Sequence, residues 1–110
     1  MKEPIVSISG IRGIYGESLT PQNIVKYTSG FAKYLKKKRV AIGRDGRLNG
    51  ELVEKIIEST LLMSGCEVIN LGVAPTPTIT LAVESLKAGG GISIPGAIPI
   101  FFRLAGRGRE

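Results

Sequence analysis

Apolar residues recur with helical spacing in the segment 20–38. They return every three or four positions, which gives one buried face made of Ile24, Tyr27, Phe31 and Leu35. Thr20 is a good N-cap, and Pro21 fits the first helical position because its missing N–H has no partner there. These signals predict a helix that ends near Lys38. Gly30 within it either weakens the helix or lets another element pack closely.

Two more helices are predicted by the same reasoning. Residues 51–64 should form one that stops at Gly65, with an apolar face made of Val53, Ile56, Ile57, Thr60 and Leu61. The next should begin with Thr76 as N-cap and Pro77 at the first helical position. Its apolar face consists of Ile79, Ala82, Val83 and Leu86.

Short apolar runs between these helices predict strands at residues 5–8, 39–43, 66–71 and 92–94. The second and third runs have the apolar character of strands buried on both faces. Strands and helices alternate, so we expect an α/β domain in which the sheet lies between helices and parallel strands have right-handed crossovers. Residues 95–110 show no clear period, and we expect them to be an unstructured terminus.

Length and charge narrow the class of protein. A chain of 110 residues, 43% of them hydrophobic, suits one globular domain. Fifteen Lys and Arg against nine Asp and Glu give a formal net charge of +6, which can attract nucleic acid, anionic membranes or phosphorylated metabolites. The run Lys36–Arg39 is interpreted as a solvated helix C-terminus, where cations favour the helix dipole.

The single cysteine and the short apolar runs indicate the cellular compartment of the protein. Cys66 is the single cysteine, and no cluster of residues suggests a metal site, so a reducing cytoplasm is the default. No stretch is long enough for a signal peptide or a membrane span. We therefore expect a soluble cytoplasmic protein without a membrane partner.

Candidate chemistry lies in the loops that follow the predicted strands, at residues 9–16, 44–50 and 72–77. The first two loops are rich in Gly and Arg. Glycine lets backbone N–H groups approach an anion, and a guanidinium binds phosphate through two parallel hydrogen bonds. A phosphorylated ligand is one interpretation; arginines that pair with Asp45 or with helix carbonyls are the other.

These loops carry a resemblance to the α-D-phosphohexomutases, the phosphoglucomutase and phosphomannomutase family. Residues 9–13, Ser-Gly-Ile-Arg-Gly, resemble the family's SGIRG opening, and residues 43–47, Gly-Arg-Asp-Gly-Arg, resemble its GRDxR loop. Residues 72–78, Gly-Val-Ala-Pro-Thr-Pro-Thr, resemble its GxxPTP turn. The motifs occur in the family's order and at about its spacing over residues 4–94, which makes the likeness specific.

The resemblance implies a fold and a reaction. The first domain of such an enzyme is a three-layer α/β/α unit with a mixed, mostly parallel four-stranded sheet, and residues 1–94 would be that domain. In the family a phosphoserine on this domain gives its phosphoryl group to a hexose phosphate, an intramolecular phosphotransfer of carbohydrate metabolism classed as isomerase chemistry. Mg²⁺ binds to the second domain in full-length members, so we expect no cofactor in this chain.

The resemblance also assigns roles to residues. Ser9, Gly10, Arg12 and Gly13 would bind phosphate, and Arg12 would act catalytically by offsetting charge on the transferring phosphoryl group. Arg44, Asp45 and Arg47 would support the wall of the cleft.

One departure concerns the nucleophile itself. The family carries TASHNP or TGSHNP after the strand that follows the glycines, but this chain has Pro95-Gly96-Ala97-Ile98-Pro99-Ile100. Ala97 stands where the serine belongs and Ile98 where the histidine belongs, and Ser93, the nearest serine, lies inside the predicted strand. We interpret residues 95–110 as a divergent tail and hypothesise a break in the reading frame after residue 94.

The expected activity follows from these residues. The chain should be a truncated phosphoglucomutase/phosphomannomutase-like protein that is inactive alone, while its full-length relatives act on a hexose phosphate. The alternative is a small phosphate-binding or self-associating module without catalysis, in which Phe101–Phe102 pairs between copies as a homo-oligomer. We expect no nucleic-acid partner, because no aromatic residues interleave the arginines of the tail.

Overall fold

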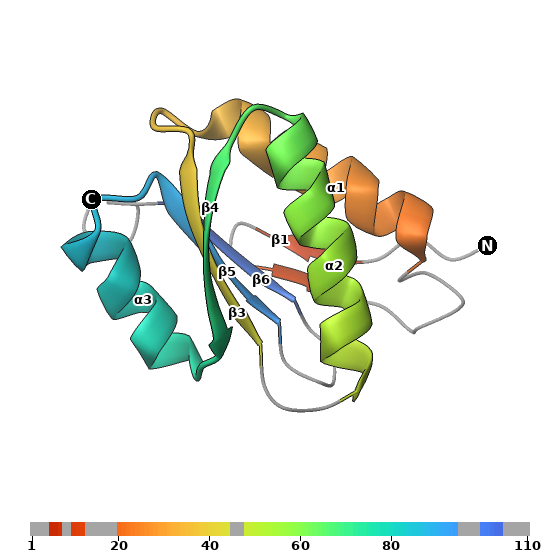
Figure 1. The fold of residues 1–110 in the computed structure, drawn as a ribbon. Helices are drawn as coiled ribbons and strands as arrows, with labels where there is room; N and C mark the ends of the chain where they lie inside the picture. Colours follow the sequence, from red (N-terminus) through yellow and green to blue (C-terminus); the bar gives the residue numbers. More distant parts are fainter. Residues whose placement is uncertain (1–4, 8–9, 13–19, 45–47, 95–99, 105–110) are drawn as a thin grey trace.

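Helices and strands alternate along the chain of this computed structural model, which describes residues 5–7, 10–12, 20–44, 48–94 and 100–104 (Figure 1). Within those ranges the elements are β1 (Ile5–Ser7), β2 (Gly10–Arg12), α1 (Pro21–Tyr34), β3 (Arg39–Arg44), α2 (Leu48–Met63), β4 (Glu67–Val73), α3 (Thr76–Ser85), β5 (Gly90–Ile94) and β6 (Phe101–Leu104). This order confirms the predicted α/β class.

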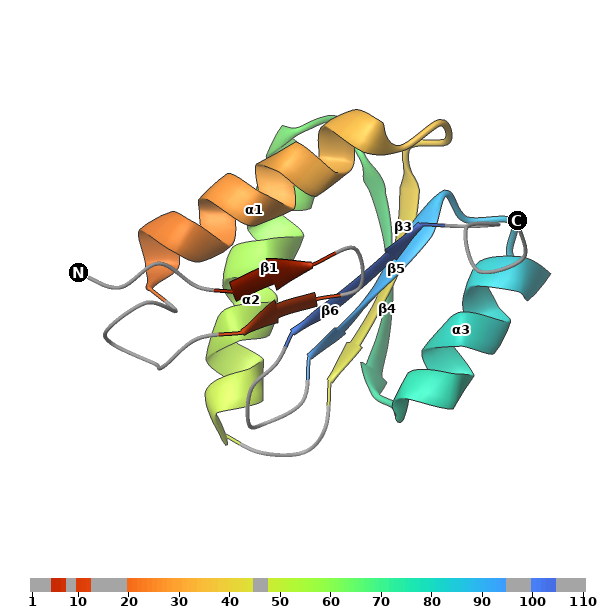
Figure 2. The ribbon, with the colours of Figure 1, turned by 180° about the vertical axis from the view of Figure 1, so that it is seen from behind.

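The main sheet has the strand order β4-β3-β5-β6. Strand β3 pairs in parallel with both β4 and β5, as expected for a mostly parallel sheet. The outer strand β6 pairs antiparallel with β5. Strand β1, which was predicted to belong to the sheet, instead forms a separate antiparallel pair with β2, and β2 contacts β6 (Figure 2).

Strand β6 corrects the expectation of an unstructured terminus. Phe102 is buried, and its ring centroid lies 5.2 Å from that of Phe31 on α1. Hydrophobic burial therefore holds this part of the tail on the sheet. Phe102 is also unavailable for the predicted pairing between copies. Residues 95–99 and 105–110 lie outside the described residues.

Helices cover the sheet unequally: α1 and α2 lie on one face, the two-helix face, and α3 lies on the other, the one-helix face (Figures 1 and 2). Side chains alternate between the faces along a strand. In β3, Val40 and Ile42 join the core beneath α1 and α2, whereas Ala41 joins a small cluster with Val83 and Ala88. The larger cluster also holds Ile24, Ala32, Leu35, Val53, Ile57, Leu61, Cys66, Ile92, Ile94, Ile100 and Phe102.

The central strands β3 and β5 are more deeply buried than β4. The interior of β3 and all of β5 are buried, which confirms the prediction for residues 39–43. The same prediction for residues 66–71 is wrong, because β4 is an outer strand that exposes Glu67, Asn70 and Val73. Its apolar residues reflect partial contact with the helices rather than burial on both faces.

The helix ends agree in part with the sequence. Thr20 caps α1 by accepting a hydrogen bond from the Asn23 N–H, but α1 ends at Tyr34 rather than near Lys38. Helix α2 begins three residues earlier than predicted, at Leu48. The predicted cap of α3 is wrong: Pro75 is the N-cap, Thr76 is helical, and Leu86, predicted to be buried, is exposed.

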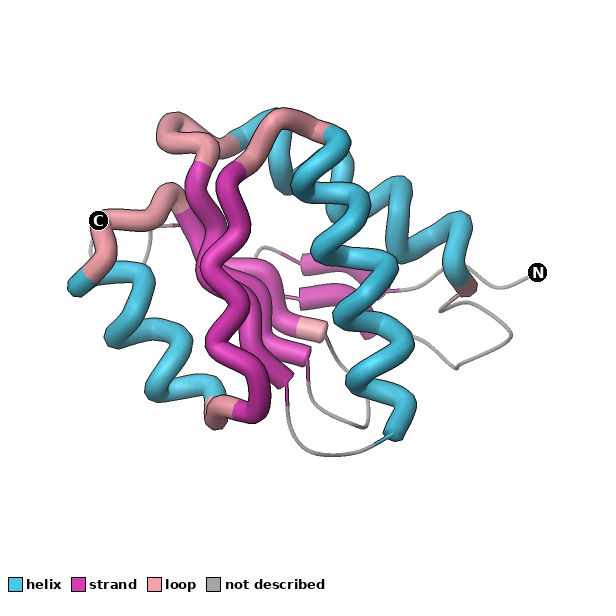
Figure 3. The backbone as a smooth tube through the Cα atoms, viewed as in Figure 1, coloured by secondary structure: helices cyan, strands magenta, loops and turns pink. Residues whose placement is uncertain are grey.

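Three loops meet where β3, β4 and β5 begin, which we call the amino edge of the sheet (Figure 3). The Lys38 carbonyl accepts a hydrogen bond from the Glu67 N–H, and the Arg39 carbonyl accepts one from the Gly89 N–H, both at 2.7 Å. A Cβ on Gly89 would lie 2.0 Å from the Lys37 carbonyl oxygen, so only glycine fits there. These contacts tie the ends of the three helices to one platform.

None of the helices in the described parts of the chain is long and apolar enough to cross a membrane.

Candidate functional site

The carboxyl ends of the three parallel strands meet at the opposite edge of the sheet, the carboxyl edge. Arg44 ends β3, Val73 ends β4 and Ile94 ends β5. The Ala74 N–H donates to the Arg44 carbonyl at 2.9 Å, which joins the first two ends directly. In α/β sheets this edge is where ligands bind, so the predicted loops that follow β3 and β4 start from a common site.

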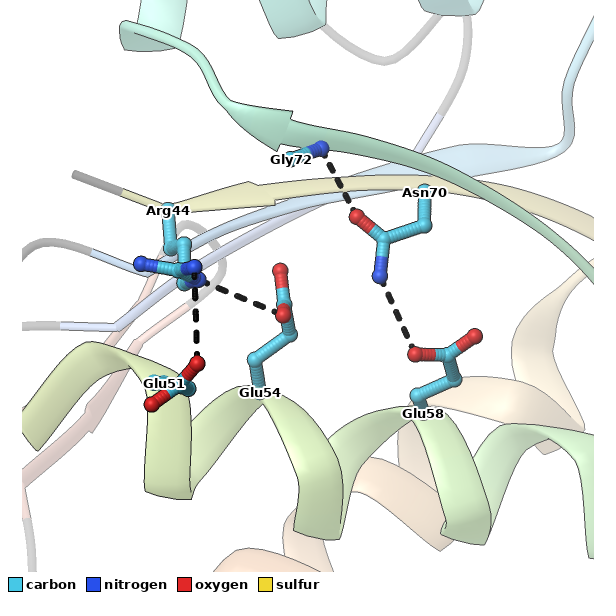
Figure 4. Close-up of polar contacts among 6 residues, drawn as sticks. All are labelled: Arg44, Glu51, Glu54, Glu58, Asn70 and Gly72. Carbon is cyan, nitrogen blue, oxygen red and sulfur yellow. Dashed lines mark hydrogen bonds and ion pairs between the residues drawn. The ribbon is translucent and has the colours of Figure 1, made fainter. Parts of the chain in front are cut away.

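Arg44 is held by carboxylates of α2 (Figure 4). Its Nε lies 3.3 Å from Glu54 Oε1, and its Nη2 lies 3.9 Å from Glu51 Oε2. The side chains of Arg44 and Glu54 are 18% and 11% exposed, so this pair is poorly screened by water. Arg44 therefore fixes the first turns of α2 against the end of β3.

Glu54 depends on that arginine. Its Oε2 is buried and has no hydrogen-bond partner among the described residues. The negative charge of the carboxylate is therefore stabilised by the Arg44 guanidinium, which contacts Oε1. A buried carboxylate without a cation is costly. Glu51 and Glu54 lie near the start of α2, where a carboxylate also suits the positive end of the helix dipole. Their three-residue spacing, which puts both on one side of α2, was the signal that they act together.

The same side of α2 also contacts β4 (Figure 4). Glu58 Oε1 accepts a hydrogen bond from Asn70 Nδ2 at 3.0 Å, and Asn70 Oδ1 accepts one from the Gly72 N–H at 2.7 Å. Gly72 has a φ of +71°, a conformation that favours glycine. The pairing of β3 with β4 shifts register between Ile42 and Arg44, next to this turn.

A second polar contact at the carboxyl edge is formed by two hydroxyl groups. Thr76 Oγ1 and Ser93 Oγ lie 2.7 Å apart, which joins the start of α3 to β5. Thr76 is already the first residue of α3, with Pro75 as its N-cap, and the Thr76 hydroxyl contacts Ser93 instead. Ser93 lies within β5, as predicted, and it is buried.

The structure places only some of the predicted site residues. Arg12 and Gly10 lie in β2, opposite Ile5 and Ser7, and the backbone alone is described there. Ser9, Gly13, Asp45 and Arg47 lie outside the described residues. For Arg44, the interpretation that it pairs with other protein groups is supported, because its partners include the α2 carboxylates of Glu51 and Glu54.

Metal and thiol chemistry find little support in the described ranges. There, no three His, Cys, Asp or Glu side chains gather closely enough to hold a metal ion. Cys66 is buried in the larger core cluster. Burial raises the pKa of its thiol, and the positive charge of Lys38 offsets part of that rise. A thiol that resists deprotonation in this way is a poor nucleophile.

Comparison with known proteins gives a consistent result. Residues 5–96 match the family described as phosphoglucomutase/phosphomannomutase, alpha/beta/alpha domain I. A probable phosphoglucosamine mutase of Methanosphaera stadtmanae is 41% identical over 88 residues, which are 78% of this chain and 20% of that protein. A phosphoglucomutase/phosphomannomutase of Thermococcus kodakarensis is 40% identical over 90 residues, 77% of this chain and 20% of that protein.

A third relative extends the range of names. The phosphoglucosamine/phosphogalactosamine mutase of Sulfurisphaera tokodaii is 38% identical over 86 residues, 77% of this chain and 19% of that protein. The chain thus spans about a fifth of the length of the curated relatives that it matches.

Proposed function

Because this chain belongs to the phosphoglucomutase/phosphomannomutase family, we propose that it forms the phosphate-facing wall of a phosphohexomutase site. The observation that carries the proposal is the match to domain I over residues 5–96. It includes two of the loops that leave the carboxyl edge of the sheet. The substrate class is a hexose phosphate, aminohexose phosphates among them, in keeping with the names of the relatives.

Within this function the arginines have different roles. Arg44, tied to Glu54 and Glu51, holds the end of β3 against α2 and supports the cleft wall together with Asp45 and Arg47. Ser9, Gly10 and Gly13 bring backbone N–H groups to the phosphate, and Arg12 offsets the charge of the transferring phosphoryl group. No catalytic step is assigned to Arg44, because its guanidinium already pairs with protein carboxylates.

The 110-residue chain alone does not catalyse phosphotransfer. Alanine at position 97 has no oxygen to accept a phosphoryl group, and Ile98 cannot replace the neighbouring histidine. We infer that the sequence diverges from the family after Ile94, although residues 101–104 of this divergent tail still add a strand to the sheet. We place the protein in the cytoplasm. Purified chain should neither convert glucose 1-phosphate to glucose 6-phosphate nor carry phosphoserine by mass spectrometry. Turnover above the buffer rate would contradict this.

A chimera tests whether the rest of the wall is competent. Residues 1–94 would be joined to the Thermococcus relative from its serine loop onward, and the fusion should interconvert hexose 1- and 6-phosphates. Arg12→Ala in the fusion should lower kcat by about 100-fold or more, since one charge-stabilising donor is lost. The matched control Lys26→Ala, an exposed residue of α1, should retain the rate.

Two outcomes would argue against the assignment. A folded chimera without turnover would mean that residues 1–94 are not a working domain I. Equal rates for Arg12→Ala and Lys26→Ala would remove the role given to Arg12. The reading-frame hypothesis has its own test: if neither alternative frame after codon 94 encodes Ser-His-Asn-Pro and a continuing domain, it fails.

A further inference from the structure

The amino edge of the sheet forms a basic end of the molecule, remote from the candidate site. Its described charged side chains are five exposed lysines, Arg39 and two carboxylates, namely Lys33, Lys36, Lys37, Lys38, Lys87, Arg39, Glu67 and Glu84. The charged side chains described elsewhere balance, with Lys26, Arg44 and Lys55 against Glu51, Glu54 and Glu58. The net positive charge of the described side chains therefore lies at this basic end.

The segments that carry the lysines are held together by hydrogen bonds and an ion pair. Arg39 Nε pairs with Glu67 Oε1 at 3.0 Å, and Arg39 Nη1 donates to the Leu86 carbonyl at 3.1 Å. Together with the backbone hydrogen bonds to Glu67 and Gly89, these contacts link the ends of all three helices. Charges on such a platform act together on one large partner surface.

Exposed apolar side chains share this end. Tyr34 at the end of α1 is 76% exposed, Leu62 and Met63 at the end of α2 are 54% and 90% exposed, and Leu86 after α3 is 42% exposed. They are half of the large hydrophobic residues that are exposed in the described parts of the chain. Lysines mixed with exposed Tyr, Leu and Met are the composition of surfaces that lie in the headgroup region of a membrane.

We propose that this basic end docks on an anionic lipid bilayer, with the lysines over the headgroups and Tyr34, Leu62 and Met63 entering the interface. Anionic lipids attract lysines electrostatically, and the apolar side chains add the second signal that stable attachment needs. Nucleic acid fits less well, because its recognition uses arginine forks and stacked aromatic rings. Here five of the six cations are lysines, and the Arg39 guanidinium already pairs with Glu67. Tyr34 is the one exposed aromatic ring among the described residues, and Leu62 and Met63 cannot stack on bases.

This proposal departs from the expectation that the chain has no membrane partner. The sequence showed the lysine run but not that Met63 and Leu86, far along the chain, share its end of the fold. The protein would lie on the bilayer without spanning it. The proposal does not rest on the proposed function, since none of its residues belongs to the carboxyl edge.

Vesicle co-sedimentation of the full chain is the test. Vesicles of phosphatidylcholine with about one-third phosphatidylserine should pellet the protein at low salt, whereas pure phosphatidylcholine should not. Lys36→Ala/Lys37→Ala should weaken binding by about tenfold to thirtyfold, given about fivefold for each lysine near an anionic surface. The matched control Lys26→Ala/Lys55→Ala, which also removes two exposed lysines, should change binding by less than about twofold.

A second variant separates the two signals. Tyr34→Ser/Met63→Ser should weaken vesicle binding several-fold while leaving its dependence on salt concentration unchanged, because the charges remain. The proposal is overturned if the phosphatidylserine vesicles do not bind, if neutral vesicles bind equally, or if both lysine pairs behave alike. Tight binding of a DNA oligonucleotide, lost in Lys36→Ala/Lys37→Ala while vesicles stay unbound, would instead assign this end to nucleic acid.

Discussion

The two faces of the same sheet are built from side chains of different size. On the two-helix face, β3 and β5 present Val40, Ile42, Ile92 and Ile94 to the larger core cluster. At the alternate positions of the same strands, Ala41 and Gly43 of β3 and Gly91 of β5 lie toward α3. One face gains stability by burying large aliphatic groups, and the other by letting a helix approach closely. The same hydrophobic strand can therefore serve two kinds of packing.

The largest effect should come from truncation on the two-helix face. Ile42→Ala removes a fully buried side chain and should lower the free energy of unfolding by about 2–5 kcal/mol. Urea denaturation followed by circular dichroism measures it. The control Val25→Ala, on the exposed side of α1, should shift the free energy by less than about 0.5 kcal/mol. A loss for Ile42→Ala no greater than for Val25→Ala would mean that this face is not the main core.

At the carboxyl edge, the two faces of the sheet end in different polar contacts. Glu54→Ala removes the nearer of the two α2 carboxylates that pair with the poorly exposed Arg44, and it should cost about 1–3 kcal/mol. Ser93→Ala removes one hydroxyl contact with Thr76 and should cost about 0.5–1.5 kcal/mol.

Both variants can be measured in the same denaturation experiment, with Glu58→Ala as a control for loss of an α2 carboxylate that bonds only Asn70 in the described structure. If Glu54→Ala and Glu58→Ala lose equal stability, the ion pair of Glu54 with Arg44 contributes no more to the free energy of unfolding than the hydrogen bond of Glu58 with Asn70.

Adding a methyl group to the one-helix face should also destabilise. A Cβ on Gly91 would lie 2.7 Å from Val83 Cγ2 and 3.1 Å from Ile79 Cγ2. Gly91→Ala should therefore cost about 1–3 kcal/mol by overpacking. In Gly91→Ala/Val83→Ala the nearest clash is gone, so the double variant should lose less than the sum of the single losses. Strict additivity in thermal or urea unfolding would show that α3 can simply move away.

The smallest effect should have the opposite sign. A Cβ on Gly30 would meet nothing within 4 Å, so the prediction that this glycine weakens α1 is supported over close packing. Gly30→Ala should raise the free energy of unfolding by about 0.5–1 kcal/mol. A decrease would show that the α1 surface is not open there. The same substitution meets close neighbours at Gly91 but open space at Gly30. The difference between the two variants therefore separates the cost of overpacking from the gain in helix propensity.

Sequence patterns predicted the helices and the parallel strands because their periods report burial. They did not predict which face of β3 meets two helices, since Val40 and Ala41 are both apolar and differ chiefly in volume. The outer position of β4 was missed because Val68, Ile69 and Leu71 mimic a central strand, and β6 because Phe102 is buried by Phe31, seventy-one positions earlier.

The candidate site was predictable only as a set of loops. Their shared edge follows from parallel pairing, which the alternation of elements indicates. The link from Arg44 to Glu54 and that from Thr76 to Ser93 depend on side-chain directions, and those directions are fixed by how α2 and α3 pack on the sheet. Local sequence cannot supply them, because Thr76 satisfies the rule for a helix cap and still has another partner.

The turn at Asn70 and Gly72 has a consequence for how copies of this protein meet. An outer strand that is straight and unprotected is a template on which further strands add. Here the Gly72 N–H is already engaged by Asn70, Glu67 places a charge at the start of the strand, and the register shift interrupts its pairing near the end. Strand β4 therefore offers only a short regular edge to a strand from another copy, which disfavours fibre-like stacking through this strand.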